Sequence, residues 1–427
     1  MLSRIAKVRL LLTVKQLRKV IFSSTAQRFA LAMSGAIVAR LGLLLMASLV
    51  GRQFGPVDYG AFTFSTSIAL LCAQIAIFGW PMMVNRKIPE MIRDQRWGHL
   101  RGMRDSGDAL IFLTATLFTI LLLVGSRWSG RLADSLILSA MLVTPFAFAI
   151  LRRQQMTAVR LSAVGLLFDQ GFGALLTAVV MVIFALHSIF WVVSVYSSGI
   201  ILGIIITSII FIKRMPAEMR TAKRQYEFKA WISIALPLLL GMSAKLLMNK
   251  VDILLLAPLS GLHESGLYGA AFRVTFLLSF PQTVMMTVLI PMISKSFVDG
   301  RDSDVSRLLK IGLAVTAATA LPTSLPFLLL PGDIMAFIFG EAFRSVAPTL
   351  VVLTLAQLAN SFSAPLGSVL MMGGRERSFG ILNASGLVMN VIFNLALIPF
   401  FGAFGAAVAT LVSSLFVAFG QIILKRH

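Results

Sequence analysis

The sequence is poor in charged residues and in the residue types that carry most catalytic and metal chemistry. Only 13% of its 427 residues are charged, against about 25% in ordinary soluble domains. It has one cysteine, Cys72, and four scattered histidines, His99, His187, His263 and His427. A disulfide framework and a local metal site are not expected from this inventory. No phosphate-binding loop motif and no nucleophile-base constellation appear. We therefore expect no enzyme, no cofactor and no ATP hydrolysis.

The sequence is rich in long apolar runs. Hydrophobic residues make up 58% of the chain, mean hydropathy is +0.89, and the runs recur along the whole length. A transmembrane helix needs about 20 mostly apolar residues, and this criterion predicts an all-α polytopic membrane protein with about twelve spans. The fifth is expected from Leu161 to Leu186. The longest connections are expected to be the basic stretches 83–108 and 213–230.

Positive charge is distributed unevenly between the two sides of the predicted membrane. The formal net charge is +21, and 30 of the 38 lysines and arginines fall in alternate connections on one side, with 4 on the other. The positive-inside rule then predicts an inner-membrane protein with both termini cytoplasmic. Residues 1–27 are expected to be a basic interfacial segment. The positive charge on the cytoplasmic side predicts an anionic lipid surface as partner, and no nucleic acid is expected.

Three short motifs recur in the two halves of the chain, as paired at the end of this paragraph. The distance along the chain from the tyrosine-glycine-alanine motif to the proline-methionine motif agrees within one residue in the two halves. Because six helices separate the copies, we expect bundles at 28–212 and 231–427, joined by the basic linker 213–230 and related by a pseudo-twofold axis along the membrane normal. A transport site is expected between the bundles. The paired motifs are Tyr59-Gly60-Ala61 with Tyr268-Gly269-Ala270, Pro81-Met82 with Pro291-Met292, and Gly165-Leu-Leu-Phe-Asp169 with Gly386-Leu-Val-Met-Asn390.

Six ionisable residues lie within the apolar spans, where a charge near the centre costs about 2.5 to 3.5 kcal/mol. Helical spacing places Lys245, Asn249 and Asp252 on one stripe. A cavity that attracts a phosphate-bearing substrate is one explanation, with the candidate binding residues Arg40, Lys245, Asn249, Lys250 and Arg273. The alternative is structural, with Asp252 paired to Arg273 or Lys250 between two helices.

The two acidic residues in the spans, Asp169 and Asp252, are the candidates for coupling transport to an ion gradient. Asp169 is preferred because Asp252 has basic neighbours in the sequence that would hold it ionised. A hydrogen-bonded packing role for Asp169 is an equal alternative.

Three motifs resemble those of the bacterial Wzx-type polysaccharide-biosynthesis flippases, within the larger group that includes multidrug and toxic compound exporters (MATE). They are Gly51-Arg-Gln-Phe-Gly-Pro-Val-Asp-Tyr59-Gly60, Phe339-Gly-Glu-Ala-Phe343, and Asn390-Val-Ile-Phe-Asn394 with Ile398-Pro-Phe-Phe-Gly402-Ala-Phe-Gly405. The resemblance implies a MATE-like fold and alternating access. It also implies an undecaprenyl-diphosphate-linked oligosaccharide as substrate, for O-antigen, exopolysaccharide or capsule synthesis.

Two other functions remain open beside the flippase. A cation-coupled multidrug exporter would have the same fold, but the mostly basic residues in the spans favour an anionic substrate. A membrane enzyme such as an oligosaccharide polymerase would need a larger outer loop than residues 331–348, the longest expected here. A polysaccharide polymerase or co-polymerase is instead a candidate partner.

Overall fold

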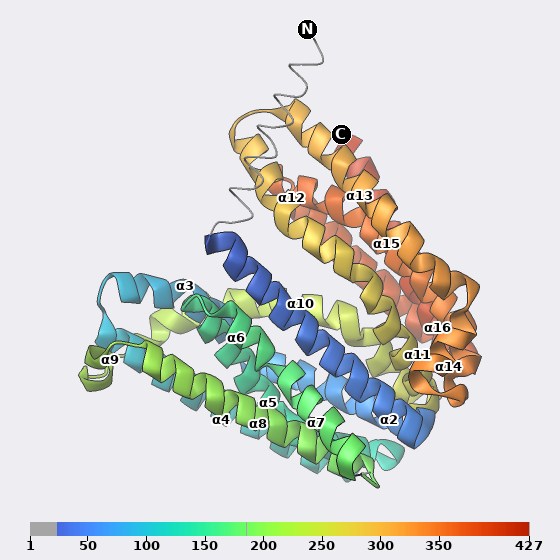
Figure 1. The fold of residues 1–427 in the computed structure, drawn as a ribbon, viewed down its shortest axis with the longest axis horizontal. Helices are drawn as coiled ribbons and strands as arrows, with labels where there is room; N and C mark the ends of the chain where they lie inside the picture. The colour runs from blue at the N-terminus through green and yellow to red at the C-terminus, as the bar shows by residue number, and fades with distance from the viewer. Residues whose placement is uncertain (1–23, 185, 427) are drawn as a thin grey trace.

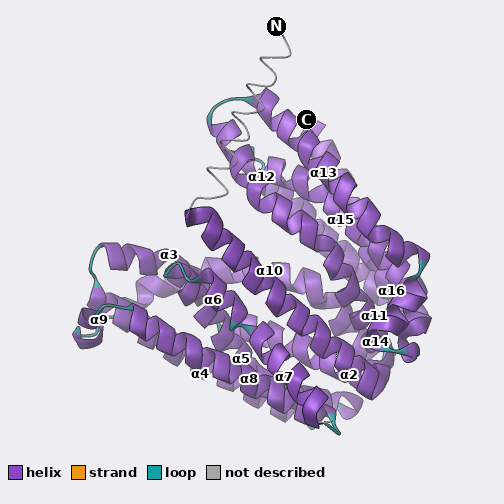
Figure 2. Cartoon of the chain, viewed as in Figure 1, coloured by secondary structure: helices purple, strands orange, loops and turns teal. Residues whose placement is uncertain are grey.

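The computed structural model describes residues 24–184 and 186–426 of the chain. Side chains are described for these residues except at positions 24–33, 237–249, 280, 284, 287, 302 and 426. The described residues form helices and connecting turns, with no strand among them (Figure 2). The predicted all-α class is therefore confirmed. Residues 1–23 of the predicted interfacial segment lie outside the described residues.

The N-terminal half is built from long apolar helices with short connections. They are α2 (Ser24–Ala76), α3 (Trp80–Arg93), α4 (Trp97–Ser126), η1 (Gly130–Leu132), α5 (Ala133–Ala158), α6 (Ser162–Leu167), α7 (Gln170–Phe184) and α8 (Ile189–Arg214). The short α9 (Ala217–Thr221) then leads into α10 (Phe228–Ser260). In hydrocarbon the backbone must satisfy its own hydrogen bonds, which explains why such apolar runs are helical.

The C-terminal half is also built from helices with short connections. Its elements are α11 (Leu262–Thr275), η2 (Phe276–Ser279), α12 (Phe280–Val298), α13 (Asp302–Leu329), α14 (Pro331–Phe339), η3 (Glu341–Val346), α15 (Ala347–Met372) and α16 (Glu376–Arg426). The expected outer connection at 331–348 is thus folded into α14 and η3.

Seven of the described helices are long and apolar enough to span a membrane, or eight if the bent pair Leu262–Ser279 and Pro281–Val298 counts as one span. Two of these helices are very long: α2 has 53 residues and α16 has 51. Each contains a glycine with non-helical backbone, Gly55 (φ 78°) or Gly402 (φ 53°), so each consists of two segments that meet at a kink. The number twelve and the pseudo-twofold axis remain predictions.

The stretch 83–108, expected as a connection between spans, is largely helical, because α3 and the first turns of α4 occupy most of it. One expectation about local structure is wrong. The fifth predicted span is not one helix, because the chain leaves the helical conformation between α6 and α7 at Phe168 and Asp169. Hydropathy did not reveal this break, since apolar residues continue on both sides of it.

The two halves lie at an angle to one another (Figure 1). Helices α2 to α8 form one group and α11 to α16 the other, and the groups diverge toward the end where α2 begins and α16 ends. We call this the splayed end. At the opposite end, which we call the apex, residues 48–60 of α2 contact α11, α14 and η3.

Small residues and aromatic rings pack the apex. A Cβ atom on Gly60 would overlap the carbonyl oxygen of Leu262, so only glycine permits this approach of α2 to α11. The Tyr59 ring lies edge-on to Phe339 and Phe343, with centroids 5.3 and 5.7 Å away. These contacts join the two halves through buried apolar surface.

Polar contacts from α2 to α14 surround this packing. The Arg52 Nε donates to the carbonyl oxygen of Ile338 at 3.0 Å, and its guanidinium also donates to Phe337. The Ser48 hydroxyl donates to the same Ile338 carbonyl. These carbonyls belong to the last turn of α14, where they have no partner within the helix and carry the negative end of its dipole.

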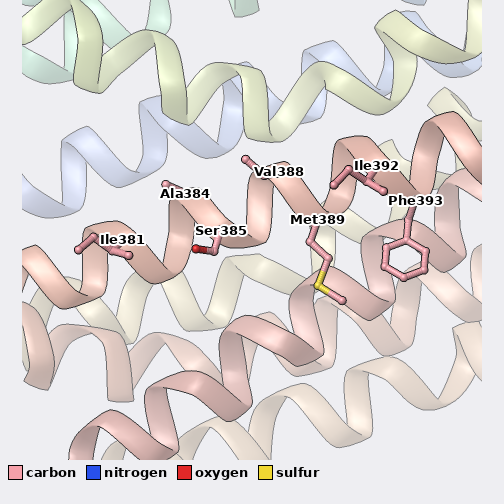
Figure 3. A pocket seen from close by; sticks show the side chains of 7 residues that line it. All are labelled: Ile381, Ala384, Ser385, Val388, Met389, Ile392 and Phe393. Carbon is pink, nitrogen blue, oxygen red and sulfur yellow. The ribbon is translucent and has the colours of Figure 1, made fainter.

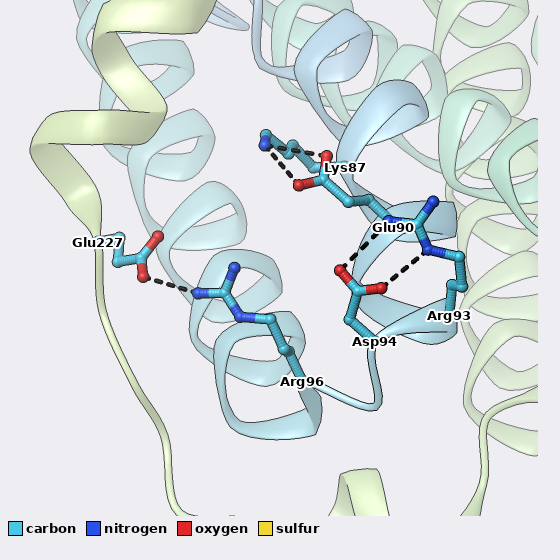
Figure 4. A network of polar contacts seen from close by, with 6 residues as sticks. All are labelled: Lys87, Glu90, Arg93, Asp94, Arg96 and Glu227. Carbon is cyan, nitrogen blue, oxygen red and sulfur yellow. Dashed lines mark hydrogen bonds and ion pairs between the residues drawn. The ribbon is translucent and has the colours of Figure 1, made fainter.

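The segment before α10 packs against the N-terminal half. Glu227 pairs with Arg96 at 2.8 Å (Figure 4), and the backbone N–H of Gln225 donates to the carbonyl of Gly98 at 3.1 Å. Trp231 in the first turn of α10 meets the Trp80 ring edge-on at 6.0 Å.

Further along, α10 contacts α11 and α16 of the other half. Helix α10 is therefore attached to both halves.

A hydrogen bond from Arg93 lowers the pKa of Asp94 below its ordinary value, at the turn between α3 and α4.

Candidate functional site

Arg40 and Arg273 lie at the contact between the two halves. Arg40, on α2, stacks over the ring of Phe276, with 5.1 Å from its guanidinium carbon to the ring centroid. Arg273, on α11, donates from Nη1 to the carbonyl oxygen of Leu43 at 3.2 Å. Each arginine thus contacts the opposite half. A cation over an aromatic face is attracted by it but keeps its charge.

The basic residues Arg40, Lys250 and Arg273 have no acidic partners among the described side chains. None of Arg40, Lys250 and Arg273 takes part in an ion pair among the described side chains. The alternative in which Asp252 pairs with Arg273 or Lys250 is therefore not observed. Uncompensated cations within apolar helices are costly, and an anionic ligand would offset that cost.

Two other predicted binding residues cannot be placed in this group. Lys245 and Asn249 belong to α10, but their side chains lie outside the described residues. Their role stays a prediction.

Asp252 lies in a buried cluster of neutral hydrogen-bond donors within the C-terminal half. Its side chain is 4% exposed. The Tyr268 hydroxyl donates to it at 2.5 Å, the Asn394 amide at 2.7 Å and the Thr410 hydroxyl at 3.0 Å. The donors come from α11 and from both segments of α16.

A second layer of amides extends this cluster. The Asn394 amide also donates to the Asn390 side-chain oxygen at 3.0 Å, and Asn390 donates to the Ser413 hydroxyl at 3.5 Å. The side-chain oxygen of Asn394 is buried and has no hydrogen-bond partner among the described atoms. The cluster thus brings a carboxylate and an unused amide oxygen together, which are ligand types for a hard cation or a proton.

Sequence reasoning found only part of this cluster. In the sequence, Asn390 and Asn394 stand out only as parts of motifs, and Tyr268 only as part of a repeat motif. Thr410 was not singled out as a site residue. The four-residue spacing of Asn390 and Asn394 on one helix face was the available signal.

Asp169 has a different environment in the N-terminal half. It is 9% exposed and pairs with Arg153 of α5, with 2.9 Å between Asp169 Oδ2 and Arg153 Nη1. Among the described side chains, Asp169 and not Asp252 has a cationic partner. The choice between the two as coupling residue stays a prediction.

An apolar groove runs beside the Asn390 segment of α16. It has a volume of about 460 Å³, and Figure 3 shows the seven lining side chains along this one helix. They are Ile381, Ala384, Ser385, Val388, Met389, Ile392 and Phe393.

The arrangement of helices is that of a known class of membrane transporters. The chain is similar to an inward-facing MATE family multidrug transporter, with a TM-score of 0.71 and 15% identity over 92% of this chain and 97% of that one. It is similarly close to the lipid II flippase MurJ in an inward closed conformation, with a TM-score of 0.72 and 14% identity over 93% and 88% of the two chains. At these identities the similarity shows the fold, and the predicted MATE-like fold is confirmed to that extent.

The sequence places the chain more narrowly. Residues 24–297 match the family described as polysaccharide biosynthesis protein, and the chain belongs to this family. The resemblance noted in the sequence is thus confirmed, and neither family nor fold is that of an enzyme.

Two curated relatives come from Haloferax volcanii. The probable flippase AglR is 31% identical over 165 residues, which are 38% of this chain and 34% of the relative. The probable low-salt glycan biosynthesis flippase Agl15 is 26% identical over 149 residues, 35% and 31% of the two chains. The matches span about a third of the relatives' length.

Proposed function

We propose that this protein moves oligosaccharide units linked to undecaprenyl diphosphate from the cytoplasmic to the outer leaflet of a bacterial inner membrane. The observation that carries the proposal is the presence of Arg40 and Arg273 where the two halves meet, two cations with no acidic partner among the described side chains. A diphosphate presents oxygens that arginine binds bidentately. Membership of the polysaccharide biosynthesis family and the names of the Haloferax relatives support a lipid-linked glycan.

The orientation follows from the basic connections. The stretches 83–108 and 213–230 belong to the splayed end, as do the start of α2 and the end of α16. Under the positive-inside rule this end faces the cytoplasm. The conformation would then be the one that receives substrate, and transport would require the apex to separate while the splayed end closes.

The test is transport in proteoliposomes loaded with a defined undecaprenyl-diphosphate oligosaccharide. Charge-assisted contacts contribute about 1.5 to 3 kcal/mol each, so Arg40→Gln and Arg273→Gln should each slow flipping about 10-fold to 100-fold. Lysine at either position should restore part of the rate, because it keeps the charge but not the planar fork.

The matched control is Arg127→Gln, which removes an exposed arginine after α4. It should flip at the wild-type rate. Wild-type flipping rates in both the Arg40 and Arg273 variants, at equal protein level, would contradict the proposal that these residues bind the diphosphate.

Ion coupling is assigned to Asp252 within the same proposal. The described side chains around Asp252 are neutral donors, which leave its negative charge in a buried place for a proton or sodium ion to compensate. Asp169 already has Arg153 for this purpose. Asp252→Asn should abolish the dependence of flipping on an imposed pH or sodium gradient, whereas Asp169→Asn should keep it. The opposite pattern would return coupling to Asp169.

A multidrug exporter is the second candidate, favoured by the likeness to a MATE transporter and by the buried carboxylate of Asp252. The two functions separate in a deletion strain. Loss of surface polysaccharide with unchanged drug susceptibility supports the flippase, and the reverse supports the exporter. Copurification of a polymerase or co-polymerase with the tagged chain would test the expected partner.

A further inference from the structure

A second groove lies between helices of the C-terminal half that do not form the Arg40 and Arg273 site. It has a volume of about 600 Å³ and opens between α13, α15 and α16. The side chains that line it are apolar except for Ser363 and a lysine at the chain end, and they are Leu313, Phe362, Ser363, Leu366, Ala418, Ile422 and Lys425.

The wall of the groove is firmly packed. Leu366 is buried in a cluster with Leu309 and Ile293, and Leu313 packs against the same cluster. Ile422, on the open side, is 38% exposed. The groove is therefore a fixed apolar slot within the membrane-spanning part and not a gap beside a loose helix.

Positive charge collects at one end of the groove. Lys425 lines it directly. Lys310 stands three residues before Leu313 on α13, which places both on one face of that helix. Arg375 donates to the carbonyl oxygen of Leu424, next to Lys425. All three are exposed, and none forms an ion pair among the described residues.

Three arginines at the splayed end of the N-terminal half, in contrast, have acidic partners. Arg96 pairs with Glu227, Arg152 with Asp108, and Arg224 with Asp105. The cations at the groove keep their full charge for an external anion. A basic cluster above an apolar slot matches a lipid with a phosphate headgroup and an acyl chain.

We propose that this groove binds one anionic phospholipid, with an acyl chain along Leu313, Leu366 and Ala418 and the headgroup phosphate between Lys310 and Lys425. The volume suits a single acyl chain better than a long polyprenyl chain. Helix α2, which carries Arg40, contributes no lining residue, so the lipid and the transported substrate occupy separate places.

The test measures retention of phosphatidylglycerol by the purified full chain, using native mass spectrometry with phosphatidylcholine as the neutral comparison. Two basic side chains near a phosphate support about a tenfold effect on affinity. Lys310→Gln with Lys425→Gln should lower retention of phosphatidylglycerol by that factor and leave phosphatidylcholine unchanged. The control Lys213→Gln removes an exposed, unpaired lysine at the end of α8 and should change neither.

A second variant tests the apolar slot. Ala418→Trp fills the groove and should also reduce phosphatidylglycerol retention, whereas Phe419→Trp, whose side chain is 62% exposed and not in the lining, should not. Equal retention in the double lysine variant and the Lys213 control would overturn the proposal, as would an unaffected Ala418→Trp. Displacement of phosphatidylglycerol by undecaprenyl phosphate at equal concentration would make a polyprenyl lipid the occupant instead.

Discussion

The two halves contain the same tyrosine-glycine-alanine motif but use its tyrosine differently. Tyr59 is buried at the apex against Phe339 and Phe343, and its hydroxyl has no hydrogen-bond partner among the described atoms. Tyr268 donates its hydroxyl to Asp252. Tyr59 thus packs at the contact between the halves, whereas Tyr268 hydrogen-bonds a buried carboxylate. The two copies of this sequence motif therefore serve different chemistry.

The buried carboxylates of the two halves differ in the same way. Asp169 pairs with a cation, Arg153, from a neighbouring helix of its own half. Asp252 has neutral donors among the described side chains, and Asn390, which the sequence motifs pair with Asp169, belongs to its second layer. A compensated charge favours a fixed structure, whereas an uncompensated one favours exchange with an external cation.

The glycines of the repeated motif give the largest expected difference. A Cβ on Gly60 would overlap the Leu262 carbonyl, whereas a Cβ on Gly269 would lie 3.1 Å from the Thr63 side chain, which can shift. Gly60→Ala should destabilise the closed apex by about 3 kcal/mol and Gly269→Ala by about 1 kcal/mol or less.

Disulfide crosslinking between cysteines introduced at the apex measures the closed fraction. In an open helix position glycine to alanine would instead be stabilising by up to about 1 kcal/mol. Equal crosslinking in the two variants would contradict the difference between the repeats.

Removing the partner of Asp169 is expected to have the next largest effect. Arg153→Gln leaves a buried carboxylate without its cation, and because the Arg153 side chain is 32% exposed the cost should be about 2 kcal/mol, below the range for fully buried pairs. Thermal unfolding in detergent measures it. Adding Asp169→Asn should restore most of the loss, and a double variant as unstable as the single one would show that the pair has no structural role.

The tyrosines themselves should respond unequally. Tyr268→Phe removes a hydrogen bond to a buried carboxylate and should cost about 1.5 kcal/mol. Tyr59→Phe removes a hydroxyl that has no partner, so stability should be unchanged or slightly higher. Equal unfolding temperatures for the two variants would mean that Tyr268 contributes nothing to holding Asp252.

The smallest effect is expected outside the membrane-spanning part. Glu227 and Arg96 form a partly exposed pair, and such pairs contribute about 0.5 kcal/mol or less. Glu227→Gln should therefore leave the unfolding temperature nearly unchanged at physiological salt. A drop as large as that of Arg153→Gln would reveal that docking of residues 222–227 depends on charge more than on the Trp80 and Trp231 packing.

The features that could be predicted from the sequence are those that depend on composition, on short motifs and on charged residues within apolar runs. The helical class, the family and the position of Arg40 and Arg273 between halves follow from such local signals. The Asp252 cluster does not, since Thr410 lies 158 residues away along the chain. Arg153 could only be counted as a connection charge, because nothing in its neighbourhood shows that α5 brings it to Asp169.

Helix α10 has a mechanical consequence. Its first turn is attached to the N-terminal half through Trp231, and Asp252 is held by helices of the C-terminal half. At 1.5 Å per residue, Phe228 and Asp252 lie about 36 Å apart along this helix. Under the proposed function, in which the two halves move relative to one another, this helix would transmit the rotation of one half to the other. A cation binding at Asp252 would then act on one end of α10, and the resulting movement would reach the splayed end.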